Sequence, residues 1–125
     1  MIKLVFCLRR LPGLSRQEFQ QYWRETHGPL VRSQAAALQI RRYVQLHTLD
    51  DPTNDALRAS RGGPEPFDGV AELWWDSIEA LGEAVSSPRG QEAGRLLLED
   101  EKRFIDLGHS PLWIGREVAI VAELP

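Results

Sequence analysis

The feature of this sequence that most constrains its fold is an amphipathic segment that begins at Ser15 and carries its apolar positions as far as His27. Ser15 and Glu18 have the spacing of a capping box, in which each side chain satisfies a free backbone N–H at the start of a helix. Phe19, Trp23 and His27 follow at intervals of four residues and therefore share one helix face. The pattern predicts a helix that begins after Ser15 and buries these three side chains.

Gly28 and Pro29, which follow His27 directly, predict the end of this helix, with Gly28 as a left-handed cap. His27 would then lie in the last turn, where the negative end of the helix dipole favours a charged imidazole and raises its pKa. The alternative is that His27 only caps those carbonyls and packs under Trp23. One or two further helical turns are expected over residues 30–38.

Four segments have the composition of β-strands: residues 2–8, 39–48, 68–75 and 112–124. Helical segments separate the first from the second and the third from the fourth. In the second segment Val44 and Leu46 point one way, whereas Tyr43, Gln45 and His47 point the other. The order strand, helix, strand, strand, two helices, strand is that of the split βαβ or ferredoxin-like unit. The sequence therefore predicts an α+β fold with an antiparallel sheet and helices on one face.

A carboxylate interrupts the apolar face of the last predicted helix, which begins after Ser87. The apolar residues on this face are Ala93, Leu97 and Phe104, and Asp100 falls between them. Buried charges are rarely left unpaired, so Asp100 reaches a cation such as a protonated histidine or an arginine, or borders a polar cavity. The alternative is a bent or frayed helix end that leaves Asp100 hydrated.

Residues 49–67 are rich in Asp, Pro, Gly and Asn, and they are expected to form a long irregular loop within a single domain of residues 1–125. Large side chains occur at alternating and at consecutive positions of the second and third strands, and therefore on both faces of the sheet: Tyr43, Val44, Leu73, Trp74 and Trp75. The sheet face without helices should then be partly apolar, and an exposed patch of that size normally marks an interface. We therefore expect a homodimer in which two sheets pack face to face.

The composition excludes several classes of protein. A net charge of −3 gives no sign of a basic surface that would bind nucleic acid. The apolar run after Met1 is too short to span a membrane and lacks a signal-cleavage pattern. A single cysteine, Cys7, excludes an internal disulfide and suits the cytoplasm. The three histidines have no metal-ligand spacing, so we expect neither a metal nor another cofactor.

Four segments in order resemble the EthD-like family of the dimeric α+β barrel superfamily: RRLPGLSRQEFQQYWRETHGPLV, RRYVQLHT, FDGVAELWWDSIEA and DEKRFID. The resemblance covers almost the whole chain apart from residues 49–66. It implies a ferredoxin-like protomer, a dimer that forms an α+β barrel, and a pocket between sheet and helices or in the barrel lumen.

The resemblance maps the family histidine of the W-x-x-x-H segment onto His27 and the aromatic residue of the second strand onto Tyr43. It also maps the D-E-x-x-F motif onto residues 100–104. Similar proteins include cofactor-independent polyketide cyclases and dehydratases, a muconolactone isomerase, and accessory proteins of ether-degrading cytochrome P450 systems. Leu73 stands where the isomerase branch has a cysteine, which argues against that reaction.

These residues support acid–base chemistry on a small aromatic or polyketide-like ligand. His27 is the expected base, oriented by Asp100, while Tyr43 and His47 are expected to donate hydrogen bonds to substrate oxygens. The expected apolar pocket consists of Trp23, Leu73, Trp74, Trp75 and Phe104. For the tryptophans the alternative is core packing, and for His47 it is an exposed strand end.

The leading hypothesis is a cofactor-free lyase, isomerase or cyclase. Two alternatives remain open from the sequence. One is a cofactor-free monooxygenase of phenolic compounds, and the other is a non-enzymatic accessory or ligand-binding protein that serves an oxygenase.

Overall fold

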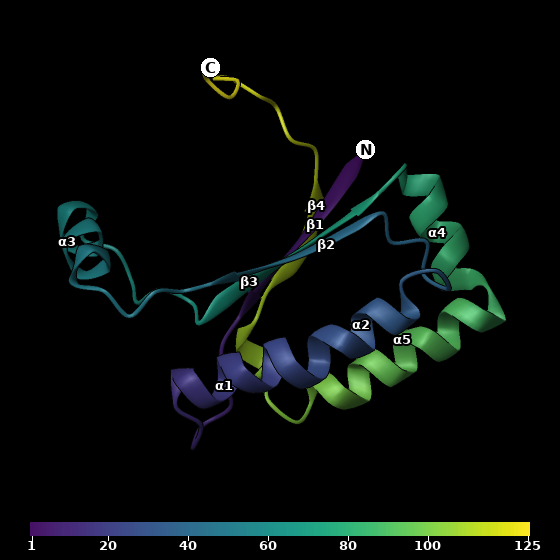
Figure 1. Ribbon diagram of the computed structural model, residues 1–125, viewed down its shortest axis with the longest axis horizontal. Coiled ribbons are helices and arrows are strands. Elements are labelled where there is room, and N and C mark those ends of the chain that lie inside the picture. Colours follow the sequence, from purple (N-terminus) through teal and green to yellow (C-terminus); the bar gives the residue numbers. More distant parts are fainter.

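The computed structural model describes residues 1–125 and contains one four-stranded antiparallel sheet with helices on one face (Figure 1). Across the sheet the strands are β2 (Arg42–His47), β3 (Gly69–Trp75), β1 (Ile2–Leu8) and β4 (Leu112–Gly115). Strand β3 runs antiparallel to both β1 and β2, and β1 runs antiparallel to β4. This crossed order confirms the predicted ferredoxin-like α+β fold.

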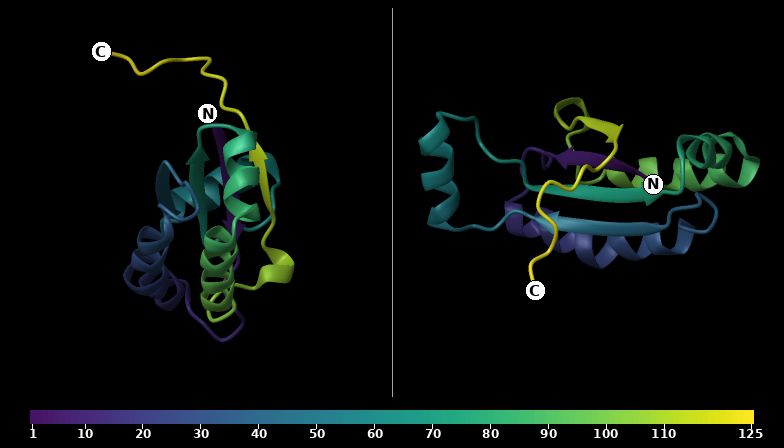
Figure 2. Two further views of the ribbon diagram at one scale, coloured as in Figure 1. Left: turned by 90° about the vertical axis from the view of Figure 1, so that its right-hand side faces the viewer. Right: turned by 90° about the horizontal axis from the view of Figure 1, so that it is seen from above.

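Two long helical elements cover one face of the sheet (Figures 1 and 2). The first is a continuous rod of α1 (Arg16–Tyr22), a π-helical turn (Trp23–His27) and α2 (Gly28–Gln34). The second is α5 (Pro88–Glu101), which α4 (Ile78–Ser86) precedes. The predicted N-terminal caps are confirmed for two helices, because Ser15 and Glu18 form the capping box of α1 and Ser87 caps α5. Ser77 caps α4 in the same way.

The core lies between this sheet face and the helical rod. Aromatic side chains dominate it, with Phe19, Trp23 and Phe104 each at most 1% exposed. Phe19 contacts both other rings, at centroid distances of 5.7 Å to Trp23 and 5.4 Å to Phe104. The four-residue spacing of the first helix therefore directs its large side chains into the core, as the sequence predicts.

The helical rod does not end at Gly28, contrary to the prediction. Gly28 has right-handed helical dihedrals (φ −55°, ψ −50°), and its N–H bonds to the Trp23 carbonyl, five residues earlier. In a regular α-helix a proline lacks the N–H for one hydrogen bond, and its ring clashes with the preceding turn. The wider π turn reduces both effects, so Pro29 continues the rod as an early residue of α2. A short 3₁₀ helix, Leu107–His109, precedes β4.

The segment 49–67 is not wholly irregular, because it contains helix α3 (Pro52–Arg61). Asp51 caps its start, and Gly62 ends it with a left-handed conformation (φ 61°). None of its residues is buried, and it lies apart from the sheet and the other helices (Figure 1). The absence of a core-facing apolar stripe explains why the hydrophobic pattern failed to predict this helix.

The last strand is much shorter than the predicted segment 112–124. Gly115 pairs with Lys3, close to the start of β1, so the chain beyond Gly115 has almost no neighbouring strand left to pair with. Beyond Glu117, which accepts a hydrogen bond from Trp74, the chain extends away from the sheet (Figure 1). Val118 and Ile120 in this extension are 75% and 87% exposed.

Candidate active site

A histidine–aspartate pair lies buried between the helical rod and α5. His27 comes from the last position of the π turn, and Asp100 comes from the last turn of α5. His27 Nδ1 lies 2.7 Å from Asp100 Oδ2, and the two residues are 5% and 9% exposed. The other oxygen of Asp100 accepts a hydrogen bond from the Tyr22 hydroxyl at 2.5 Å. The carboxylate on the apolar face of α5 thus has two partners, the buried His27 and the half-buried Tyr22.

The imidazole of His27 is held in its neutral form. Burial lowers the pKa of His27 more than the hydrogen bond and negative charge of Asp100 raise it. This direction is opposite to the predicted one, because the rod continues past Gly28 and leaves no free helix end beside the ring. A carboxylate only accepts, so Nδ1 carries the hydrogen and Nε2 keeps its lone pair. Nε2 has no hydrogen-bond partner in the protein.

His27 lines a small cavity of about 50 Å³, here called the inner cavity. The inner cavity lies between the sheet and the helices, and most of its wall is apolar. The wall includes Trp23, His27, Tyr43, Leu73, Leu97 and Glu101. A neutral imidazole with a free nitrogen therefore faces a largely apolar space, where charge interactions are stronger than in water.

Glu101 is a second carboxyl group at the inner cavity, and the sequence reasoning missed it. Burial raises the pKa of Glu101 to about 7, and the negative charge of Asp100 adds to the rise. On an ideal α-helix Glu101 lies about 100° around the axis from Asp100, so the apolar face of the sequence pattern includes Asp100 alone. Because α5 ends at Glu101, the last turn still lets both side chains face inward. The adjacent acidic pair of the D-E-x-x-F motif was the available signal.

Tyr43 stands on the opposite wall of the inner cavity, on β2. Its hydroxyl oxygen accepts a hydrogen bond from Gln45 Nε2 at 2.8 Å, which leaves the hydroxyl hydrogen free to donate. Burial raises the pKa of Tyr43, so the phenol stays protonated at neutral pH. Gln45 Nε2 also donates to the Trp23 carbonyl at 3.0 Å, so it ties β2 to the π turn.

His47 does not reach the inner cavity. Its ring stacks on Trp23 at a centroid distance of 4.5 Å, and its Nε2 lies 2.8 Å from Gln45 Oε1. Burial and the positive charge of Arg24 lower the pKa of His47. The structure therefore places His47 against Trp23, linked to Tyr43 through Gln45, rather than on the wall of the inner cavity.

The expected aromatic pocket divides into residues at the site and residues elsewhere. Trp23 and Leu73 line the inner cavity, and Phe104 packs on the His27 ring at 5.0 Å. Trp75 donates to the Leu38 carbonyl at 2.7 Å, and Trp74 donates to Glu117 at 3.0 Å on the open sheet face. Alternation along β3 sends Trp74 to the open face. Trp75 shares the helical face with Leu73 but lies two residues further along β3, against Leu38, so neither tryptophan lines the cavity.

No three histidine, cysteine or acidic side chains gather in a metal-binding arrangement. No helix has both the length and the apolar character needed to cross a bilayer.

Fold and site together define an α+β protein of the ferredoxin-like type with a buried histidine–aspartate pair at a small apolar cavity. The model of the EthD domain family matches residues 11–108, and the chain therefore belongs to the EthD family. Among curated proteins no relative matches the chain.

Several solved structures share the fold. One is an ethyl tert-butyl ether D (EthD) family protein from Bacillus halodurans, with 24% identity over 94% of this chain and 99% of that one, at a TM-score of 0.60. Another is a dimeric ferredoxin-like protein of unknown function from Bacteroides fragilis, with 8% identity over 93% and 95%, at 0.58. A third is an antibiotic biosynthesis monooxygenase, with 14% identity over 94% and 99%, at 0.51. At these identities the likeness shows the fold alone.

Proposed function

We propose that this protein is a cofactor-independent acid–base enzyme, a lyase or dehydratase, isomerase or cyclase, that acts on a small aromatic or polyketide-like compound. The observation that carries the proposal is the buried, neutral His27, whose Nδ1 is held by Asp100 and whose ring lines the inner cavity. A positioned imidazole with a free nitrogen is the usual general base near neutral pH.

In the proposed reaction, His27 Nε2 removes a proton from the carbon next to a substrate carbonyl. The electron pair of the C–H bond forms a C–C double bond, and the carbonyl π electrons move to the oxygen. Tyr43 donates a hydrogen bond to the resulting enolate, and Asp100 stabilises the imidazolium.

Glu101 supplies the proton that completes the proposed reaction. With a pKa of about 7, a sizeable fraction of Glu101 is protonated at neutral pH. In a dehydration, the enolate re-forms the carbonyl and expels a β-hydroxyl, which leaves as water with the Glu101 proton. The proton on His27 then returns to Glu101 through solvent, and both groups are restored. In an isomerisation, Glu101 protonates a different carbon instead.

The test is proton exchange rather than turnover of an unknown substrate. We would follow deuterium incorporation into 2-tetralone, an aromatic ketone, by NMR in D₂O. His27→Gln should lower the protein-dependent exchange by about 100-fold or more. Equal exchange by a folded His27→Gln variant and the wild type would contradict the assignment of the base.

The chain offers a matched control for this substitution. His109 Nδ1 lies 2.8 Å from Asp106 Oδ2, the same pair at almost the same distance, but the His109 side chain is 79% exposed. His109→Gln removes an equivalent imidazole from the surface. It should leave the exchange rate within twofold of the wild type.

A second candidate function is a cofactor-free monooxygenase, which the structural neighbour described as an antibiotic biosynthesis monooxygenase favours. The same His27 would then deprotonate an electron-rich phenol, and dioxygen would react with the anion. Oxygen uptake with a naphthol, lost in His27→Gln, would support this function. Binding of aromatic ligands with neither exchange nor oxygen uptake would instead support an accessory, ligand-binding role.

We further propose that the protein is a homodimer that joins the open faces of two sheets. Strand alternation places the Lys3–Glu72 ion pair on this face together with several apolar side chains. These include Val5, Val44, Leu46, Val70 and Trp113. Leu46 and Trp113 are 57% and 53% exposed. The ferredoxin-like neighbour that is described as dimeric supports the association of two copies.

A further inference from the structure

A second, larger cavity lies beside the inner cavity, at the edge of the sheet that β2 forms. This outer cavity has a volume of about 420 Å³ and lies between β2 with its preceding loop and the helical rod. Its apolar wall consists of Val31, Ala35, Ile40 and Tyr43. Val31 and Tyr43 line the inner cavity as well, so the two cavities adjoin.

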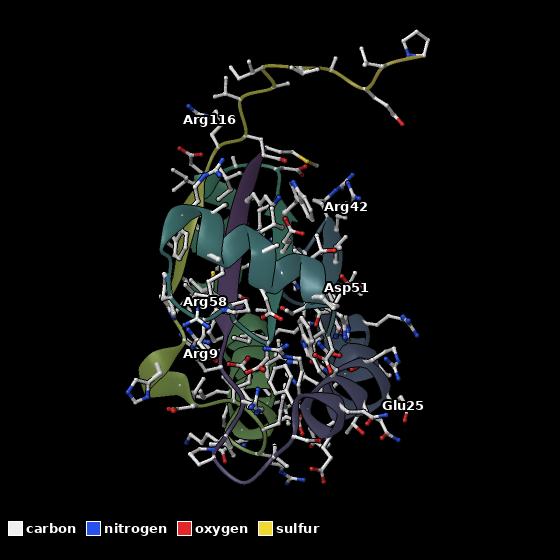
Figure 3. All side chains as sticks on the ribbon, turned by 90° about the vertical axis from the view of Figure 1, so that its left-hand side faces the viewer. Arg9, Glu25, Arg42, Asp51, Arg58 and Arg116 are labelled. Atoms are coloured by element: carbon white, nitrogen blue, oxygen red, sulfur yellow. The ribbon has the colours of Figure 1, made fainter.

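Four arginines line the outer cavity, and no acidic residue does: Arg24, Arg32, Arg41 and Arg42. Arg24 belongs to the π turn and Arg32 to α2, whereas Arg42 is the first residue of β2 and Arg41 directly precedes it. The guanidinium of Arg42 lies over the Trp74 ring at 4.7 Å, so Arg42 contributes least to the cavity itself. Figure 3 shows Arg42 at the edge of the sheet.

The other three arginines have loose counterions or none. Arg24 lies 3.5 Å from Glu25, and Arg41 lies 3.6 Å from Asp76, in pairs whose side chains are all more than half exposed. Arg32 has no ion pair. Exposed pairs of this kind contribute little free energy, so a ligand anion competes with them easily. This concentration of positive charge occurs in a chain whose net charge is −3.

We propose that the outer cavity binds the oxyanion of an aromatic ligand, a carboxylate or a phosphate ester, through Arg24, Arg32 and Arg41. This inference rests on the proposed function, because it assigns the substrate class of the same site. The ring of the ligand packs on Val31 and Tyr43 and points toward His27. Arginine suits this role because its planar guanidinium binds an oxyanion through two parallel hydrogen bonds.

The test is direct binding of three probes of one shape: 2-naphthoate, 2-naphthyl phosphate and the neutral 2-naphthol, measured calorimetrically at pH 7.5. We expect the wild type to bind at least one anion tenfold or more tightly than 2-naphthol. Raising the salt concentration from 50 to 500 mM should weaken binding of the anion only, because salt screens the charge interaction. Whichever anion binds more tightly identifies the source of the oxyanion.

The decisive variant is the double substitution Arg24→Gln with Arg32→Gln. It should weaken anion binding by tenfold or more and change 2-naphthol binding by less than twofold. The matched control is Arg58→Gln with Arg61→Gln on α3, which removes the same charge away from the cavity and should leave anion binding within twofold. Anions that bind no more tightly than 2-naphthol, or an effect equal to that of the control, would overturn the proposal.

The same measurements separate this proposal from the proposed function. His27→Gln should bind the preferred anion within twofold of the wild type, because His27 does not line the outer cavity. Arginine-dependent binding by a protein that exchanges no protons would leave the anion site standing and reject the enzyme. Proton exchange without arginine-dependent binding would reject the anion site alone.

Discussion

His27 and His109 each face an aspartate at nearly the same distance, 2.7 Å and 2.8 Å, yet one pair is buried and the other is hydrated. Burial makes the His27 pair a hydrogen bond between a neutral imidazole and a carboxylate rather than an ion pair. The aspartate then fixes which ring nitrogen carries the hydrogen. Whether such a pair can act as a base is decided by this tautomer and by access to a cavity.

Asp100→Asn should lower the pKa of His27 below its wild-type value, because it removes the negative charge and the strong acceptor that both raise this pKa. Exchange of 2-tetralone protons should fall by about tenfold to 100-fold, since the imidazolium loses its partner. An NMR titration of the His27 ring measures the pKa. Asp106→Asn, at the surface pair, is the control, and an unchanged or raised His27 pKa in Asp100→Asn would contradict the argument.

Glu101 makes a separate contribution to stability. Its folded pKa of about 7 lies above its ordinary value of 4.5, so the folded state binds more protons than the unfolded state between these values. This contribution is fully present below pH 4.5 and is lost as the pH rises through 7. Glu101→Gln removes the cost of burying a charged carboxylate, which the wild type bears at high pH. The variant should therefore be more stable than the wild type at pH 8 by about 2 kcal/mol, after a discount for partial exposure.

Urea unfolding at pH 5 and pH 8 checks this prediction. The lowered pKa of His27 makes stability rise with pH below 6.5, which is the opposite of the Glu101 effect. Because wild type and Glu101→Gln share this contribution, it cancels in the difference between them. Glu99→Gln, at an exposed position on α5, should show no such dependence on pH. A stability difference between wild type and Glu101→Gln that is equal at both pH values would refute the assignment.

At the level of helices and strands, the close approach of the helical rod to β3 sets the position of the site. A Cβ atom added to Gly69 would lie 2.8 Å from Trp23 Cη2 and 2.9 Å from the Leu46 carbonyl. Trp23 in turn carries the stacked ring of His47 and borders the inner cavity. Glycine at this position of β3 is therefore what lets the large ring sit on the sheet.

Gly69→Ala should destabilise the protein by about 2–3 kcal/mol, because the indole has to move out of a packed core. Gly82→Ala in the middle of α4 is the matched control, since an added Cβ meets no atom within 4 Å there. That control should raise stability by up to about 1 kcal/mol through better helix propensity. Thermal or urea unfolding decides the matter, and similar effects of the two substitutions would be inconsistent with the clash.

The sequence predicts the elements that carry strong local signals. The serine caps, the strand alternation around Tyr43 and the inward face of Asp100 are all confirmed. The π turn could not be predicted, because Gly28 and Pro29 favour a helix end, whereas the contacts made along the continued rod are tertiary, with α5 and through the hydrogen bond from Gln45 to the Trp23 carbonyl. Helix α3 lacks a buried face. Trp75 shares a face with Leu73, and only its tertiary contact with Leu38 shows that it lies outside the cavity.

At the scale of the whole molecule, one face of the sheet is covered by helices and the other is open (Figure 2). The open face carries exposed apolar side chains, among them Leu46 near the end of β2, which is 57% exposed. Burying such side chains against a second copy contributes about 25 cal/mol per Å². The proposed dimer therefore follows from the one-sided arrangement of the helices.

Leu46→Lys should weaken the dimer by tenfold or more, because it places a charge in the proposed interface. Leu57→Lys on α3 is the control, since Leu57 is exposed to a similar extent, 60%, but lies away from the sheet. Sedimentation velocity over a range of protein concentrations measures the dissociation constant. Equal behaviour of the two variants would argue against association through the open sheet face.

The π turn at Trp23–His27 also marks a place where the family can vary in length. A π turn spreads one extra residue over a single widened turn, so deleting one residue here would restore regular α-helical winding and leave the downstream part of the rod almost unrotated. Val31 would then still face the cavities. Natural variants that have lost this residue should therefore keep the apolar positions of α2, so the deletion can be inherited on its own.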